Sequence, residues 1–342
     1  MTRMMIVGIT FISYVIANVV IVGAEAPCDI FKAGSTPCVA AHSTVRALYQ
    51  SFNGSLYSVR RQSDQKSLDI GVKTVGGFAD SAAQDVFCQG EICVFDRIYD
   101  QSPNQNHLGI GPPGGAHWKK DIAAVATADP LTVGGHKVYG LRMDPPSGYR
   151  NDTTTGIAVG DEAETIYAVF NGSHYNDRCC FDYGNAETNN LDDGKTTMEA
   201  LYFGNANGGL NHGGAGKGPW IMADMENALW GADVVKSNER PINHDFVSAM
   251  IKGDVSTNAP GGHWAIKGGD ANQGKLDVYW DGKRAPKYAP MHKQGAIILG
   301  IGGDNSDGAV GTFYEGCMTQ GYSSDASDDA VQANIIEAGY GR

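Results

Sequence analysis

The sequence predicts an all-β fold, an antiparallel β-sandwich with a few short helices. Its 342 residues include 46 glycines and only 19% charged residues, a composition typical of many short strands joined by glycine turns. The apolar runs are short and do not alternate with long helical patterns, which disfavours a parallel α/β sheet. No repeat, linker or change in composition divides the chain, so we expect one domain over residues 25–342.

The N-terminus has the layout of a secretory signal peptide. Arg3 precedes an apolar run that ends at Ala24, and small residues surround that point. We expect cleavage after Ala24 and secretion to the extracellular medium. The alternative is a retained anchor, because about 18 apolar residues can span a bilayer.

The remaining elements follow from local patterns. Helical spacing predicts a helix over residues 44–52, and a serine followed by Asp328 and Asp329 predicts another over residues 327–338. Residues 99–108 are a polar, turn-rich loop, and Asp281-Gly282 is a hairpin turn signal. Alternating or continuous apolar residues predict strands at 55–60, 137–143, 165–170, 276–280, 296–301 and 312–322.

A strand pattern at residues 219–227 carries the first candidate site. Alternation places Asp224 and Glu226 on one face behind Trp220, about 6.6 Å apart along the strand. Clustered carboxylates beside an aromatic suit a sugar-cleaving cleft, which needs one protonated and one ionised acid. The alternative is an edge strand with a solvated acidic face.

A second candidate, Asp304, follows a predicted buried strand and the pair Gly302-Gly303. Glycine allows a backbone to approach a ligand closely, so we include Gly303 among the substrate-binding candidates; the alternative is a plain turn. The chain has no Gly-x-Ser-x-Gly motif, no nucleotide-binding loop and no metal-ligand spacing among its histidines. We therefore expect no metal and no cofactor.

The charge balance narrows the class of partner. A net charge of −12 and a pI near 5.1 disfavour nucleic acids and anionic membranes, which attract basic proteins. A neutral polysaccharide fits better.

Seven cysteines indicate an oxidising compartment. Short loops close easily, which predicts the bonds Cys28–Cys38 and Cys88–Cys93. The adjacent Cys179 and Cys180 then form either a vicinal disulfide or one bond to Cys317. Three glycosylation sequons begin at Asn53, Asn151 and Asn171.

Several runs closely resemble glycoside hydrolase family 54, the α-L-arabinofuranosidases. They are residues 175–188 (Tyr-Asn-Asp-Arg-Cys-Cys-Phe-Asp-Tyr-Gly-Asn-Ala-Glu-Thr), residues 218–227, residues 296–305 and the early Pro-Cys-Val-Ala-Ala-His-Ser-Thr. The resemblance extends from Cys28 to Tyr340. It implies a concanavalin-like β-sandwich (jelly roll) that releases terminal arabinofuranosyl groups from arabinoxylan and arabinan with retention of configuration. We expect such an enzyme to act as a monomer.

The resemblance also implies the role of each site residue. Glu226 falls on the nucleophile and Asp304 on the acid/base. Asp224 and Asn227 fall on sugar-binding positions, and Cys179–Cys180 falls on a vicinal disulfide, leaving Cys317 free. A retaining pair would have carboxyl groups about 5–5.5 Å apart. The rival arrangement pairs Asp224 with Glu226 and leaves Asp304 structural.

Two departures from the family pattern bear on function. The loop over residues 208–218 has no tryptophan to stack near the sugar, and we expect the protein to lack the arabinose-binding module of well-known family members. We therefore expect weaker stacking on the substrate and poorer action on insoluble polymer. The competing hypothesis is a non-catalytic, lectin-like sandwich that binds carbohydrate.

Overall fold

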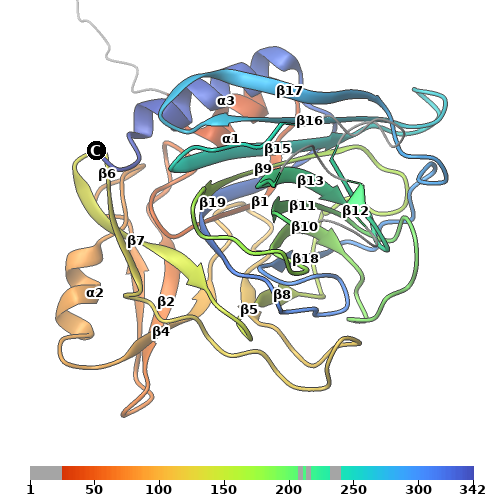
Figure 1. The fold of residues 1–342 in the computed structure, drawn as a ribbon. Helices are drawn as coiled ribbons and strands as arrows, with labels where there is room; N and C mark the ends of the chain where they lie inside the picture. The colour runs from red at the N-terminus through yellow and green to blue at the C-terminus, as the bar shows by residue number, and fades with distance from the viewer. Residues whose placement is uncertain (1–24, 207–210, 213–216, 232–239) are drawn as a thin grey trace, which may run out of the picture.

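Two β-sheets face one another and form the body of the molecule (Figure 1). The computed structural model describes residues 25–206, 211–212, 217–231 and 240–342, so the expected signal segment lies outside the described residues. Within these ranges every pairing between named strands is antiparallel except that of β12 with β14. The fold is the predicted β-sandwich.

The first sheet has eight strands in the order β17-β16-β15-β9-β19-β7-β6, and β1 pairs with β19. Its strands are β1 Cys38–Ser43, β6 Asp129–Val133, β7 His136–Met143, β9 Glu164–Asn171, β15 Phe246–Gly253, β16 His263–Asp270, β17 Gln273–Lys283 and β19 Gly311–Gln320.

The second sheet has eleven strands in the order β12-β14-β13-β11-β10-β18-β8-β5-β4-β2-β3. They are β2 Ser55–Arg61, β3 Ser67–Gly71, β4 Cys93–Ile98, β5 Leu108–Ile110, β8 Tyr149–Asn151, β10 Asp182–Ala186, β11 Glu199–Gly204, β12 Asn211–His212, β13 Trp220–Asp224, β14 Leu229–Trp230 and β18 Ala296–Leu299. Strands β13, β11, β10 and β18 lie side by side and carry the candidate site at one end.

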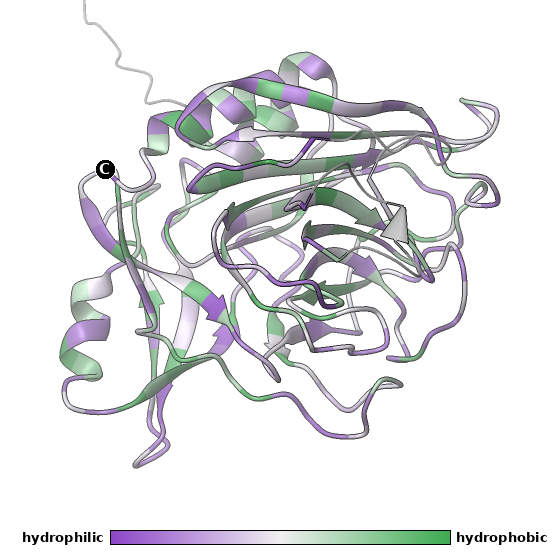
Figure 2. Ribbon diagram, in the orientation of Figure 1, coloured by the Kyte–Doolittle hydropathy of each residue, from purple (hydrophilic) through white to green (hydrophobic). Residues whose placement is uncertain are grey.

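The main core consists of buried residues of both sheets, and Figure 2 colours many of the strand segments there as hydrophobic. Phe170 of β9 stacks on Phe203 of β11 with ring centroids 5.7 Å apart, and it meets Phe181 edge-on at 5.3 Å. These contacts join the two sheets. The near-continuous apolar run that predicted β9 is explained by burial of both faces of that strand.

In the described ranges, three helices lie outside the sheets, namely α1 Pro27–Ala33, α2 Ser81–Phe87 and α3 Asp325–Ala338. The predicted C-terminal helix is α3, which begins slightly earlier than expected because Ser324 caps it by accepting from the amide of Ser327. Helices α1 and α3 pack against each other (Figure 1). No helix in the described ranges is long and apolar enough to cross a membrane.

The predicted helix at residues 44–52 is wrong. Its apolar residues Val45 and Leu48 are buried, but the backbone amides bond elsewhere. Ser43 Oγ accepts from the amides of Val45 and Arg46, and Gln101 Oε1 accepts from that of Leu48. Tertiary partners therefore replace the helical hydrogen bonds.

The hairpin signal at Asp281-Gly282 is also wrong. Strand β17 continues through both residues, and Gly282 pairs with Trp264. The turn lies at the other end of β17, between the paired residues Asp270 and Gln273. There Asp270 Oδ1 accepts from the amide of Asn272 at 2.9 Å. Glycine is tolerated in a strand that is open to solvent, so the Asp281-Gly282 dipeptide alone does not determine where the chain turns.

The structure contains the disulfides Cys28–Cys38, Cys88–Cys93 and Cys179–Cys180, and Cys317 is free and buried. The vicinal alternative for the adjacent cysteines is therefore the one formed.

Candidate active site

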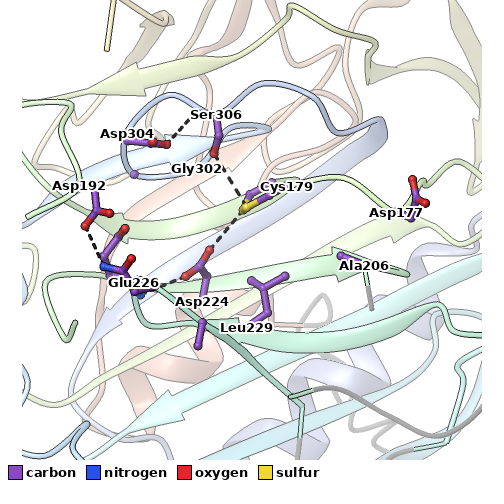
Figure 3. Close-up of a pocket in the computed structure, with 14 residues that line it drawn as sticks. Asp177, Cys179, Asp192, Ala206, Asp224, Glu226, Leu229, Gly302, Asp304 and Ser306 are labelled. Carbon is purple, nitrogen blue, oxygen red and sulfur yellow. Dashed lines mark hydrogen bonds between the residues drawn. A yellow bond between two sulfur atoms is a disulfide. The ribbon is translucent and has the colours of Figure 1, made fainter. Parts of the chain in front are cut away.

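A cavity of about 400 Å³ opens at the end of β13 and contains every predicted catalytic and substrate-binding residue (Figure 3). They come from three segments: the residues before β10, the turn after β13 and the loop after β18. The cavity-lining predicted residues are Cys179, Cys180, Asp224, Glu226, Asn227, Gly303 and Asp304.

Glu226 reaches the cavity through a turn rather than along a strand. Strand β13 ends at Asp224, and Glu226 and Asn227 have φ angles of 67° and 60°. The left-handed region is unusual for glutamate and is held here by neighbours. The amide of Glu226 donates to Asp224 Oδ1 at 3.0 Å, and Tyr288 Oη donates to the carbonyl of Glu226 at 2.9 Å. The expected strand geometry for Glu226 is thus wrong, although its carboxyl group does reach the cavity beside Asp224.

The loop after β18 brings Asp304 to the same cavity. A Cβ atom at Gly303 would clash with Glu187 Oε2 and lie 3.0 Å from Glu226 Oε2. Glycine at this position therefore lets both carboxyl groups pack closely against the loop backbone. The buried Arg150 anchors the loop by donating to the carbonyl of Gly303 at 2.5 Å and to Asn305 Oδ1 at 2.8 Å. Arg150 also donates to the carbonyl of Glu187.

The vicinal disulfide forms one wall of the cavity (Figure 3). Sγ of Cys180 lies 3.3 Å from Asp224 Oδ2. A disulfide sulfur carries no hydrogen, so only a protonated Asp224 can donate across this contact. Trp220 packs with Met222 beneath this wall and is fully buried, so its ring supports the wall without lining the cavity.

Four carboxyl groups gather at the cavity: those of Asp224 and Glu226 line it, and those of Asp182 and Glu187 are buried beside them. Burial, together with the neighbouring Asp224 and Glu187 carboxylates, raises the pKa of Glu226 to about 11. Burial also raises the pKa of Asp224 to about 7 and that of Asp182 well above its usual range. Like charges this close cannot all ionise, so the substrate-free site holds protons at neutral pH.

Sequence reasoning missed Glu187, Asp182 and Arg150. Glu187 is fully buried, accepts from Thr197 Oγ1 at 2.5 Å, and its charge helps to raise the pKa of Glu226. Glu187 and Asp182 both lie in the run of residues 175–188 that carried the family resemblance, which was the available signal. Arg150 had none, because a lone arginine in a three-residue strand forms no motif.

The remaining expected residues lie at the edge of the site or away from it. Asn227 donates to Asp192 Oδ1 at 2.8 Å. Asn53 is exposed, while Asn151 and Asn171 are half-buried at the ends of strands β8 and β9. Most of the loop over residues 208–218, where a tryptophan was expected and not found, lies outside the described residues.

Comparison with known proteins agrees with this geometry. The family model described as the catalytic domain of α-L-arabinofuranosidase B matches residues 27–341. The chain belongs to this family. It is 53% identical over 324 residues to α-L-arabinofuranosidase B of Aspergillus kawachii, and 50% identical over 325 residues to that of Aspergillus oryzae. These matches cover 92% and 93% of this chain but 63% of each relative, so the chain spans less than two thirds of their length.

Solved structures show the same likeness. An arabinofuranosidase complexed with arabinofuranosyl-α-1,2-xylobiose superposes with a TM-score of 0.86 at 51% identity, covering 92% of this chain and 66% of that one. A glutamate-to-glutamine mutant of a family 54 α-L-arabinofuranosidase, soaked with 4-nitrophenyl α-L-arabinofuranoside, superposes with a TM-score of 0.86 at 50% identity over the same shares.

Proposed function

We propose that this protein is a secreted, retaining exo-α-L-arabinofuranosidase. The observation that carries the proposal is the meeting of Glu226 and Asp304, from two separate loops, in one cavity walled by the Cys179–Cys180 disulfide. Family membership and the arabinofuranosides present in two similar structures support the substrate class.

The reaction proceeds by double displacement. Glu226 attacks the anomeric carbon, the bond to the leaving oxygen breaks, and Asp304 protonates that oxygen. Water then attacks the glycosyl ester, Asp304 takes its proton, and Glu226 leaves as the carboxylate. Two inversions give net retention, and the chemistry uses only side chains of this protein.

Glu226 must be ionised when it attacks. At rest the neighbouring Glu187 carboxylate favours the protonated form of Glu226, so this proton must leave Glu226 before the attack. The positive charge that develops on the sugar ring in the transition state favours the ionised form of Glu226. Resting protonation and a nucleophilic role are therefore compatible.

Polymer preference and setting complete the proposal. We propose that the protein acts as a monomer on side groups of arabinoxylan and arabinan outside the cell. The three disulfides suit an oxidising compartment, and the acidic chain suits a neutral polysaccharide.

Release of 4-nitrophenol from 4-nitrophenyl α-L-arabinofuranoside tests the activity, and NMR of the first-formed arabinose tests retention. Glu226→Gln should abolish turnover. Asp304→Asn should slow poor leaving groups far more than activated aryl ones, because only the former need a proton. The matched control is Asp177→Asn, since Asp177 lines the same cavity at its solvent edge.

Two outcomes would contradict the proposal. Binding of arabinosides without turnover would favour the lectin-like alternative. Equal losses on both substrate types in Asp304→Asn would remove its role as the acid and favour the pairing of Asp224 with Glu226.

A further inference from the structure

His117, Asp121 and Asp307 form a cluster outside the cavity. Nε2 of His117 lies 2.9 Å from Asp307 Oδ2 and 3.6 Å from Asp121 Oδ1, and the three ligand atoms lie within 4.8 Å of one another. His117 and Asp121 belong to the loop after β5, and Asp307 belongs to the loop that carries Asp304.

The polar atoms of this cluster lack hydrogen-bond partners. The side chain of Asp121 is 0% exposed, and neither of its oxygens accepts a hydrogen bond. Nε2 of His117 is buried and also makes none, because its contact with Asp307 lacks hydrogen-bond geometry. Burying a carboxylate without a partner is costly, and a second carboxylate nearby raises the cost.

No described lysine or arginine side chain contacts the carboxylate of Asp121 directly. Arg150 is close enough to act on Asp121 through its charge, but its N–H groups donate to Gly303, Asn305, Glu187 and Asp152. The backbone closes on the other side, because a Cβ atom at Gly111 would clash with Asp121 Oδ2, and one at Gly148 would lie 2.8 Å from it. The carboxylate is thus held where a small cation could reach it.

We propose that His117 Nε2, Asp121 and Asp307 bind a zinc ion. One imidazole nitrogen and two carboxylate oxygens are ligands that Zn²⁺ accepts, with a fourth position left for water. Bonds of about 2.0–2.2 Å place tetrahedral ligands about 3.4 Å apart, and the 2.9 and 3.6 Å separations bracket that value. The side chains of His117 and Asp307 are partly exposed, at 24% and 19%. This exposure gives the ion an entry path and lets the carboxylate of Asp307 adjust its distance from that of Asp121.

The ion would join two loops at the active site. Asp307 follows Asp304 by three residues, and the amide of Ala116 already donates to the carbonyl of Asp304 at 2.9 Å. Zinc would fasten the His117 loop to the Asp304 loop and restrain the acid/base. Its role is positioning, because the cluster is not part of the cavity lining.

The rival explanation needs no metal: a protonated His117 pairs with Asp307, and Asp121 keeps its proton. Metal content separates the two. Protein freed of metal with a chelator is titrated with ZnCl₂ in a calorimeter, and the zinc retained after dialysis is measured by mass spectrometry. We expect one zinc per chain in the wild type, and at least tenfold weaker binding in His117→Ala and Asp307→Asn.

The matched control is His263→Ala. His263 Nε2 contacts Asp281 Oδ1 at 2.6 Å on strands β16 and β17, so the variant removes a similar His–Asp pair from another part of the protein. It should bind zinc as the wild type does. Zinc should also raise the Tm of wild type and His263→Ala but not of Asp307→Asn, a nearly isosteric change whose folding the same scan reports. Absence of stoichiometric zinc in the wild type, or equal binding in His117→Ala, would overturn the proposal.

Discussion

Asp182 is fully buried beside Asp224, and neither carboxyl oxygen of Asp182 has a hydrogen-bond partner among the described residues. Both pKa values are raised, chiefly by burial. A raised folded-state pKa gives stability that is fully present below the unfolded-state value and is lost as pH rises toward the folded-state value.

We therefore expect the Tm to fall as the pH rises from about 4, the value for a free aspartate, toward 7, the pKa of Asp224. Asp182→Asn is nearly isosteric but removes one titrating carboxyl group of the pair, so the Tm of the variant should vary less over this range. Calorimetric scans of both proteins at several pH values check this. Parallel curves would mean that the Asp182–Asp224 pair does not titrate as described.

Glu187→Gln should shift the pH dependence of catalysis. The Glu187 carboxylate raises the pKa of Glu226, so a neutral amide lowers that pKa and lets Glu226 ionise at lower pH. The acid limb of the kcat/KM profile should move to lower pH. An acid limb that stays in place, with only a lower plateau, would leave Glu187 a purely structural role.

Gly303→Ala should lower kcat/KM by about a hundredfold or more, because misplacement of catalytic groups by about an ångström has that effect. The added Cβ would displace the Glu187 and Glu226 carboxyl groups. Gly109→Ala is the control, since nothing lies within 4 Å of the Cβ that it would add. Steady-state kinetics on the aryl arabinoside decide the comparison, and full activity in Gly303→Ala would contradict the account of the site.

Arg150→Met should reduce kcat and cost roughly 2 kcal/mol of unfolding free energy, because it leaves buried acceptors without a donor. The acceptors affected include the carbonyls of Gly303 and Glu187. Arg142→Met removes an exposed guanidinium that pairs with Asp144, and it should change neither quantity by much. Similar denaturation midpoints in the two variants would show that Arg150 is not the anchor.

Cys317 should not react with a thiol reagent in the native protein. Burial raises the pKa of its thiol well above the usual range, and the thiolate is the reactive form. Ellman's reagent should find one thiol per chain only after unfolding without reductant. Rapid reaction of the native protein would show that Cys317 is accessible.

Long apolar patterns predicted the strands well. The runs that became β9, β18 and β19 are buried along their length, so local pattern and tertiary environment agree. Short elements were missed: α1 and α2 have seven residues each, too few for a periodic signal. The segment after Ser43 has helical spacing, but side chains distant in the sequence take its amide donors.

The site was predicted only in part. Local pattern suggested Asp224, Glu226 and Asp304, and their roles came from the family resemblance. The protonation of the cluster could not be predicted, because Asp182 and Glu187 meet Asp224 and Glu226 only when β10 and β13 flank β11 in the sheet. Nor could local sequence show that Glu226 would take a left-handed conformation, which Tyr288 helps to hold from far along the chain.

Strand β19 is the last strand in the sequence, yet it pairs with β1, β7 and β9 inside the first sheet. During synthesis the edges of β7 and β9 that pair with β19 therefore have no partner strand until the chain has been made as far as residue 320. Such non-local pairing slows folding and exposes strand edges that aggregate. A chain cut before Gly311 would keep all the cavity-lining residues but lose the strand that joins β1, β7 and β9, so we expect such a product to aggregate rather than to act as a smaller enzyme.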